Sequence, residues 1–178
     1  MKTAIIYATT HGTTEKAARM IKDELGGEGV SLFNLKTDSE PDLGEFERVI
    51  VGGSIHAGRV QSGIKKFCNR RQAELLQKEL GLFLCGMNKP AYRKQFENAF
   101  SEELRAHSRS NKTLGGEFLF EEMNFFQRFI VKRIAKIKES VSDLKEDRVK
   151  KFTRKFDSSD SSDSKDLKDS EVSEDSKD

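Results

Sequence analysis

The sequence lacks the features that would place the protein in a bilayer or in a disulfide-stabilised secreted class. Its two cysteines, Cys68 and Cys85, are too few for a disulfide framework. No segment approaches the roughly 18 consecutive apolar residues needed to cross a membrane. The sequence also opens without a charged leader, an apolar stretch and a small-residue cleavage site. We therefore expect a protein of the reducing cytoplasm, whose membrane contact could only be peripheral.

Motifs for several common ligands are missing as well. No CxxC, histidine pair or carboxylate cluster has metal-ligand spacing, so we expect no metal site. No zinc finger, recognition helix or aromatic and basic sheet motif is present, so we expect no nucleic-acid partner. The chain has neither GxxxxGK[ST] nor GxGxxG, which disfavours an ATP or NAD site on a glycine-rich loop.

Charge is distributed unevenly along the 178 residues, although the formal net charge is only +2. Residues 157–178 contain nine Asp or Glu, eight Ser and three Lys. Such a segment has too little apolar surface to offset the entropy lost on ordering, so the composition predicts a disordered acidic tail. The remaining residues, 1–156, carry 29 Lys or Arg against 21 Asp or Glu and are expected to form one basic domain.

Apolar runs alternate with helical patterns throughout the predicted domain. The expected strands are residues 3–8, 30–35, 48–53, 80–86 and 113–120. One helix is expected to follow residue 12, to bury Ala17, Ala18, Ile21 and Leu25, and to end at Gly26 and Gly27. Further helical spacing occurs at 63–77 and within 90–111. Strands that alternate with helices need crossover connections, which predict a doubly wound α/β fold with a parallel sheet.

The stretch TTHGTT after the first strand is the main candidate for ligand binding. Ligands of doubly wound sheets bind at the carboxyl ends of the strands. Hydroxyls of Thr9, Thr10, Thr13 and Thr14, together with backbone N–H groups at a helix start, can bind a phosphate without any cationic side chain. Gly12 would allow a close backbone approach. The alternative is an ordinary helix N-cap, but six such residues exceed what a cap requires.

Two further loops are expected at the same edge. GGSIHAG at residues 52–58 follows the third strand, and the sequence beginning CGMNKP at residue 85 follows the fourth. His56 could contact a ligand ring or donate to a substrate, and the alternative is an exposed histidine without a role. His11 is expected near the bound phosphate and not as a catalyst.

The threonine loop and the GGSIHAG turn resemble the phosphate and isoalloxazine loops of flavodoxin-like FMN proteins. Within that superfamily the chain is most similar to the menaquinone-dependent protoporphyrinogen dehydrogenase family. The similarity includes the opening MKT strand, the GxSIxxG pattern of Gly53, Ser54, Ile55 and Gly58, and the aromatic and basic segment at 125–137. It covers residues 1–156.

The resemblance implies a flavodoxin-like doubly wound sheet of five parallel strands in the order 2-1-3-4-5, with helices on both faces. It implies FMN as cofactor, and oxidation of protoporphyrinogen IX to protoporphyrin IX with a quinone acceptor, a step of haem biosynthesis. It assigns no catalytic residue. The cofactor-binding residues that it implies are Thr9, Thr10, His11, Gly12, Thr13, Thr14, Gly53, Ser54, Ile55, His56, Ala57, Gly58, Gly86, Met87 and Asn88.

The chain departs from the family near the expected flavin. Ala57 stands where the family often has an aromatic residue, and residues 87–112 form a shorter segment than in the best-known members. The absence of tryptophan removes the side chain that often stacks on FMN in electron-carrier flavodoxins. His56, Met87 or Tyr92 could cover the ring instead, and propionates could meet Lys89, Arg93 or Arg128.

A helix is predicted at 123–138, with Phe125 and Phe129 beside Arg128, Lys132 and Lys136. Exposed aromatic rings among cations are typical of peripheral membrane contact, here at the inner face of the cell membrane. Packing against the neighbouring insert or a dimer partner is the alternative.

Three other functions remain open. They are a flavodoxin-type electron carrier, an FMN-dependent NAD(P)H or quinone reductase, and a membrane-associated binding protein without turnover. The basic domain argues against a carrier of the usual acidic type.

Overall fold

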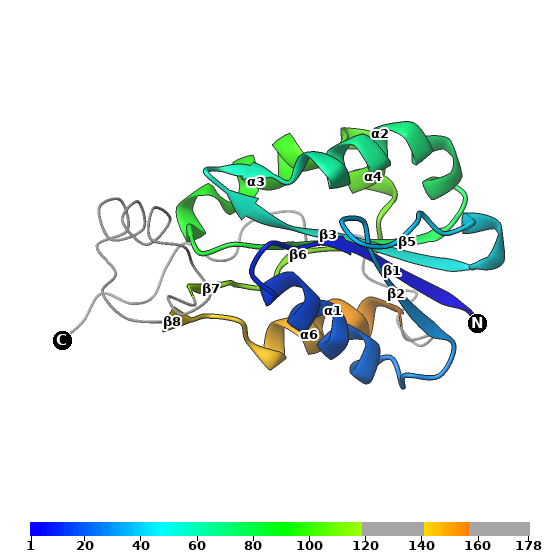
Figure 1. Ribbon diagram of the computed structural model, residues 1–178, viewed down its shortest axis with the longest axis horizontal. Helices are drawn as coiled ribbons and strands as arrows, with labels where there is room; N and C mark the ends of the chain where they lie inside the picture. Colours follow the sequence, from blue (N-terminus) through cyan, green and yellow to red (C-terminus); the bar gives the residue numbers. More distant parts are fainter. Residues whose placement is uncertain (119–140, 157–178) are drawn as a thin grey trace.

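The computed structural model describes residues 1–118 and 141–156, and its layered arrangement is shown in Figure 1. The strands are β1 (Thr3–Ala8), β2 (Val30–Asn34), β3 (Arg48–His56), β4 (Arg59–Val60), β5 (Glu79–Cys85), β6 (Ser110–Thr113), β7 (Glu117–Phe118) and β8 (Val141–Ser142). The α-helices are α1 (Thr13–Glu24), α2 (Ser62–Leu75), α3 (Tyr92–Ala99), α4 (Glu102–His107) and α6 (Glu146–Thr153). Short 3-10 turns are η1 (Leu43–Glu45), η2 (Lys89–Ala91) and η4 (Arg154–Phe156). The predicted helix at 123–138 and the predicted tail at 157–178 lie outside the described residues.

Five parallel strands form the main sheet in the order β2-β1-β3-β5-β6. Counted along the chain without the short β4, this is the predicted order 2-1-3-4-5, so the predicted fold class is confirmed. β1 lies between β2 and β3, and the winding reverses direction there. All five carboxyl ends meet at one edge, which is where the three candidate loops begin.

Alternate residues of each strand point to opposite sides of the sheet, and helices cover both of its faces. On one face Ile6, Val51 and Leu82 pack with Ile64 and Phe67 of α2. The opposite face packs against α1 and α6, and Figure 1 shows these helices below the sheet with α2, α3 and α4 above it. This second core contains Ile5, Ile50, Phe83, Ala17, Ala18, Ile21, Phe152 and Phe156. Full burial of a Leu, Ile or Phe side chain contributes about 1.5–3 kcal/mol.

The fifth strand differs from its predicted position at 113–120. β6 spans Ser110–Thr113 and pairs with β5, so the strand begins and ends earlier. Gly115 then adopts a left-handed φ of 95°, which takes the chain out of the strand direction. Residues 117–118 instead form β7, which pairs antiparallel with β8 in a separate two-stranded sheet.

The third strand also continues beyond its predicted end at residue 53. β3 extends to His56 and forms an antiparallel hairpin with β4. Ala57 and Gly58 connect the two strands with φ values of 48° and 78°, the backbone that a two-residue hairpin turn requires. The apolar pattern stops at residue 53 because Ser54 and His56 leave the buried part of the sheet.

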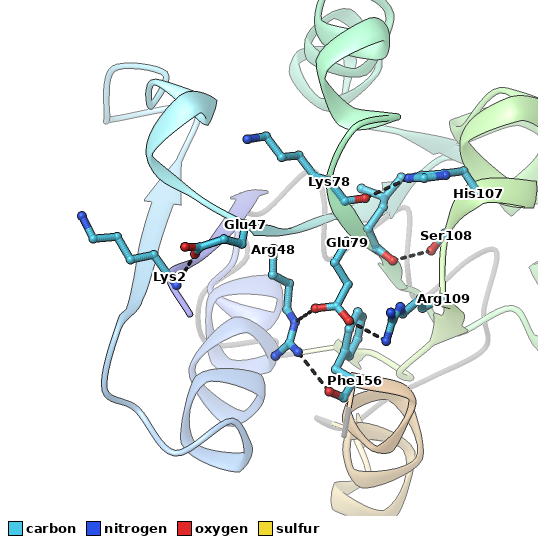
Figure 2. A network of polar contacts seen from close by, with 10 residues as sticks. Lys2, Glu47, Arg48, Lys78, Glu79, His107, Ser108, Arg109 and Phe156 are labelled. Atoms are coloured by element: carbon cyan, nitrogen blue, oxygen red, sulfur yellow. Dashed lines mark hydrogen bonds and ion pairs between the residues drawn. The ribbon is translucent and has the colours of Figure 1, made fainter. Parts of the chain in front are cut away.

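Polar contacts fasten the opposite, amino edge of the sheet (Figure 2). Arg48 Nε lies 2.6 Å from Glu79 Oε2, and Arg109 Nη1 lies 2.6 Å from Glu79 Oε1. Arg48 also donates to the carbonyl of Phe156 over 3.0 Å, and its guanidinium lies 4.7 Å from the Phe156 ring centroid. The network therefore ties η4 to the ends of β3 and β5, away from the candidate ligand-binding edge.

Candidate functional site

The first candidate loop connects β1 to α1. Gly12 occupies the N-cap position with φ 74°, and no side chain caps the helix start. A left-handed backbone at this position costs a residue with a β-carbon about 1–2 kcal/mol, which glycine avoids. The first-turn amides of a helix have no intrahelical acceptor. The uncapped start of α1 therefore offers N–H donors and a positive dipole to an anion.

The threonine hydroxyls of this loop lie at different depths. Thr9, Thr13 and Thr14 are buried, whereas Thr10 is exposed. The Thr14 Oγ1 atom is buried and has no hydrogen-bond partner among the described residues. A buried hydroxyl without a partner is unfavourable, and a phosphate oxygen would be a suitable partner. The donor set at this loop consequently fits a phosphate monoester.

Two side chains that the sequence analysis did not identify also reach this loop. Lys36 Nζ donates to Thr10 Oγ1 over 3.0 Å, and Gln61 Nε2 donates to the same oxygen over 2.7 Å. Lys36 follows β2, and Gln61 immediately precedes α2. The rule that ligand-binding loops follow parallel strands could have drawn attention to Lys36, whereas no local pattern marks Gln61.

The second candidate region is the β3–β4 hairpin, which carries Gly53, Ser54, Ile55 and His56, with Ala57 and Gly58 at its turn. Gly53 lets the hairpin fold back closely, because a β-carbon there would lie 2.9 Å from Cγ2 of Val60. Ser54 Oγ and His56 Nε2 are 2.9 Å apart. Ser54 and Ile55 are half-buried, whereas His56, Ala57 and Gly58 are exposed.

The two candidate histidines lie near each other although they come from different loops. The ring centroids of His11 and His56 are 5.9 Å apart. The pKa of His56 is lowered, chiefly because the surrounding protein removes water from the ring, and also because His11 and Lys36 would place positive charge beside a protonated imidazole. The fold therefore favours neutral His56 and brings the phosphate loop and the hairpin together.

The third candidate loop, Gly86–Asn88, follows β5, and hydrogen bonds fix both the N–H and the carbonyl of Gly86. Gly86 N donates to the carbonyl of Gly115 over 2.9 Å, and Tyr92 Oη donates to the carbonyl of Gly86 over 2.9 Å. A β-carbon on Gly86 would lie 3.4 Å from the Ile55 side chain, so this loop is next to the hairpin. Gly86 and Met87 are half-buried and Asn88 is exposed.

Cationic side chains gather around Asp143 beside the third loop. Lys89 and Lys145 each lie 3.8 Å from a carboxylate oxygen of Asp143, and Arg148 lies 3.6 Å from it. Tyr92, which bonds to the third loop, is half-buried, and this burial is the main reason that the pKa of its hydroxyl is raised. The structure thus places Lys89 near the candidate site. Arg93 instead pairs with Glu97 on the exposed face of α3, and Arg128 lies outside the described residues.

Both cysteines are buried, and burial raises the pKa of Cys68 to about 12. A reactive thiolate is exposed and has a lowered pKa, so Cys68 does not fit that role, and Cys85 is not exposed. Within residues 1–118 and 141–156, no group of three or more His, Cys, Asp or Glu side chains is arranged to hold a metal ion. None of the helices in those ranges combines the length and apolar character needed to cross a bilayer.

Comparison with known proteins identifies relatives along most of the chain. A family model described as "Flavodoxin domain" matches residues 4–145. Protoporphyrinogen IX dehydrogenase [quinone] of Escherichia coli K12 is 23% identical over 155 residues, which cover 83% of this chain and 86% of that protein. A flavodoxin of Nostoc sp. PCC 7120 is 23% identical over 163 residues, covering 88% and 96%.

A solved short-chain flavodoxin associated with a PDU bacterial microcompartment matches the fold. It aligns with a TM-score of 0.55 at 17% identity, covering 87% of this chain and 96% of that one. This similarity supports the doubly wound architecture of the sheet.

Proposed function

Because this chain belongs to the flavodoxin domain family, whose cofactor is FMN, we propose that it is a dehydrogenase that oxidises protoporphyrinogen IX and passes the electrons to a quinone. Family membership confirms the predicted FMN cofactor and makes the chain a flavodoxin-like oxidoreductase. The identity of the substrate, protoporphyrinogen IX, and of the electron acceptor, a quinone, is our proposal. The observation that carries them is the 23% identity with the E. coli protoporphyrinogen IX dehydrogenase over 83% of this chain.

The three loops have the chemistry to hold FMN. Residues 9–14 would bind the phosphate through backbone amides and hydroxyls, and the orphaned Thr14 hydroxyl fits that role. The hairpin at 53–58 and the loop at 86–88 would flank the isoalloxazine ring, because they lie next to each other at the same edge. Bound FMN supplies two-electron redox chemistry, while the protein orients the ring and controls access to it.

The proposed reaction removes six electrons and six protons from protoporphyrinogen IX in three two-electron oxidations. Each pair of electrons, with two protons, would reduce one quinone to its quinol, so three quinones are consumed per porphyrin. Lys89 lies beside the third loop, where its ammonium could bind a propionate of the substrate. We assign no side chain as a catalytic base.

A lipid-soluble acceptor would require access to a membrane. We propose that residues 123–138, which lie outside the described part of the chain, make a peripheral contact with the inner face of the cell membrane. Sedimentation with anionic and neutral lipid vesicles tests this contact. Binding that is stronger to anionic vesicles supports it, and equal absence of binding to both contradicts it.

A flavodoxin-type electron carrier is the second candidate. The match with the Nostoc flavodoxin covers 96% of that protein, at the same 23% identity. A carrier would use the same FMN loops without a substrate site. It would cycle one electron at a time and would not turn over porphyrinogen. An NAD(P)H-dependent reductase would instead be recognised by rapid bleaching of the flavin with reduced nicotinamide.

An anaerobic assay tests the proposed function. The purified protein is loaded with FMN and mixed with protoporphyrinogen IX, with and without menaquinone, and porphyrin fluorescence is followed. Multiple turnovers that depend on the quinone support the proposal. A flavin-loaded protein that forms no porphyrin with any quinone contradicts it. Failure to take up FMN would favour the third alternative, a membrane-associated binding protein without turnover.

A further inference from the structure

Thr10, in the exposed part of the phosphate loop, is the meeting point of three segments that are distant in the sequence. Its Oγ1 atom accepts hydrogen bonds from Lys36 Nζ at 3.0 Å and from Gln61 Nε2 at 2.7 Å. A threonine hydroxyl has two acceptor positions and one proton to donate. Both acceptor positions are thus used. Among the residues that the structure describes, nothing accepts the remaining proton, which is available to a ligand oxygen.

The turn after β2 fixes the backbone of Lys36. The Lys36 backbone N–H donates to the side-chain oxygen of Asn34 over 3.2 Å, and the neighbouring Leu35 N–H donates to the carbonyl of Tyr7 on β1 over 2.8 Å. The nearby Asp38 carboxylate accepts from Asn34 N and from Thr37 Oγ1. Lys36 itself forms no ion pair with any residue in the described ranges, so its charge is not neutralised there.

Gln61 is also held by its backbone. Its carbonyl accepts from Ile64 N over 3.1 Å and from Lys65 N over 3.4 Å at the start of α2. Its Oε1 atom is buried without a hydrogen-bond partner within the described chain, whereas its Nε2 is committed to Thr10. The Gln61 side chain therefore braces the phosphate loop from the start of α2.

A phosphate loop with no Lys or Arg of its own thus has a cation supplied by another strand's loop. We propose that Lys36, with Gln61 bracing Thr10, is a specificity-determining residue that makes the site select the phosphate dianion of FMN over uncharged riboflavin. The inference rests on FMN binding at residues 9–14. Lys36 adds a full positive charge to the partial charge at the start of α1, and it polarises the Thr10 hydroxyl toward an anion.

Flavin binding by variants at Lys36 tests the inference. Wild-type, Lys36→Gln, Lys36→Arg and Lys22→Gln proteins are stripped of flavin and titrated with FMN and with riboflavin, using the quenching of flavin fluorescence. Lys22→Gln is the matched control. It removes the same charge from the last turn of α1, about 15 Å from Gly12 at 1.5 Å of rise per residue. Each variant is also unfolded by heat to verify its folding.

We expect Lys36→Gln to weaken FMN binding about tenfold, the typical effect of losing one charge-assisted hydrogen bond. Riboflavin binding should not change, because riboflavin has no phosphate. Lys36→Arg should retain most of the FMN affinity, and Lys22→Gln all of it. Added salt should weaken FMN binding less in Lys36→Gln than in the wild type, because one screened attraction has been removed.

Two results would overturn the inference alone. One is a folded Lys36→Gln protein that binds FMN as tightly as the wild type. The other is an equal loss of affinity for FMN and riboflavin, which would show that Lys36 only maintains the loop's structure. Failure of the wild type to bind FMN, even at saturating concentration, would instead contradict the cofactor assignment on which the inference depends.

Discussion

At the scale of single residues, Gly12 is the position where backbone conformation and ligand binding are most closely connected. Its φ of 74° lies in the left-handed region, which is strained for residues with a β-carbon and most of all for β-branched ones. Gly12→Val should therefore shift the loop and turn its N–H groups away from the phosphate. We expect the dissociation constant for FMN to rise roughly 5- to 30-fold, since about 1–2 kcal/mol of strain is introduced.

Fluorescence titration with FMN measures the effect, and Gly26→Val is the control. Gly26 has a similar φ of 87°, and a β-carbon there meets no atom within 4 Å. Gly26→Val should consequently reduce the free energy of unfolding without changing FMN affinity. Equal FMN affinity of Gly12→Val and wild type would rule out the phosphate role of this loop.

His56 makes the second prediction at this scale, which concerns pH. Its pKa in the folded protein is lowered from the ordinary value of 6.5, mainly because the surrounding protein removes part of the water around the ring. Below that value the unfolded chain binds a proton more readily than the folded one. The contribution of His56 to stability is therefore present above pH 6.5 and is lost as the pH falls through the window toward its lowered pKa.

Urea unfolding of the flavin-free protein at about pH 7.5 and about pH 5.5 measures this loss, since the two values bracket the ordinary histidine pKa. We expect His56→Gln to lose less stability between these two pH values than the wild type. An identical loss in both proteins would contradict a lowered pKa. Titration of the His56 ring by NMR gives the pKa directly.

At the scale of elements, Gly52 and Phe83 show how β3 and β5 can lie side by side. A β-carbon on Gly52 would come within 2.4 Å of three atoms of the Phe83 ring. Gly52 and Phe83 are register partners in these two strands. The ring therefore occupies the space over Gly52, so the first of the two glycines at the end of the apolar run 48–53 is required for packing.

The polar network at the amino edge of the sheet predicts a loss of stability when Arg48 is removed. Arg48 and Glu79 are the first residues of β3 and β5, and their side chains are 6% and 16% exposed. Arg48→Ala would leave the Glu79 carboxylate with one fewer partner and the Phe156 carbonyl without its donor. We expect a loss of about 3 kcal/mol in the free energy of unfolding, as for other buried ion pairs that lose one partner.

The matched control is Arg19→Ala. Arg19 pairs with Glu15 on the exposed surface of α1, with 65% of its side chain exposed, and removal of such a solvent-screened pair changes the free energy of unfolding very little. Urea denaturation compares the two variants. FMN affinity should be unchanged in Arg48→Ala, because the network lies at the edge of the sheet opposite to the loops. Similar stability of both variants would show that the amino-edge network does not fasten η4.

At the scale of the whole molecule, composition alone predicts that the acidic segment at 157–178 is disordered. Nine acidic and eight serine side chains leave little to bury. A chain that ends after Ser158 should therefore retain both the unfolding free energy and the FMN affinity of the full chain. Urea denaturation and FMN titration of the two chains provide the comparison. A loss of about 1 kcal/mol or more, a large part of the stability of a typical domain, would contradict the prediction.

Much of the architecture was predictable because its signals are local and repeated. The buried runs at 3–8, 30–35 and 48–53 fit parallel strands covered on both faces, and the order 2-1-3-4-5 followed from the family resemblance. The fifth strand was placed wrongly because TLGGEFLF is apolar, yet Gly115 turns the chain into a separate pair of strands. Hydropathy alone does not distinguish a sheet partner from a strand that pairs elsewhere.

The sequence by itself determined the alternation of strands and helices, and with it the edge at which residues 9–14, 53–58 and 86–88 gather, because parallel strands place their carboxyl ends together. The functions of those individual residues stay predictions. Only the tertiary structure decided that Lys36 and Gln61 reach Thr10 and that Arg48 reaches Phe156. Such contacts depend on the register between distant strands and on where each connecting turn directs its side chains. No local pattern contains that information.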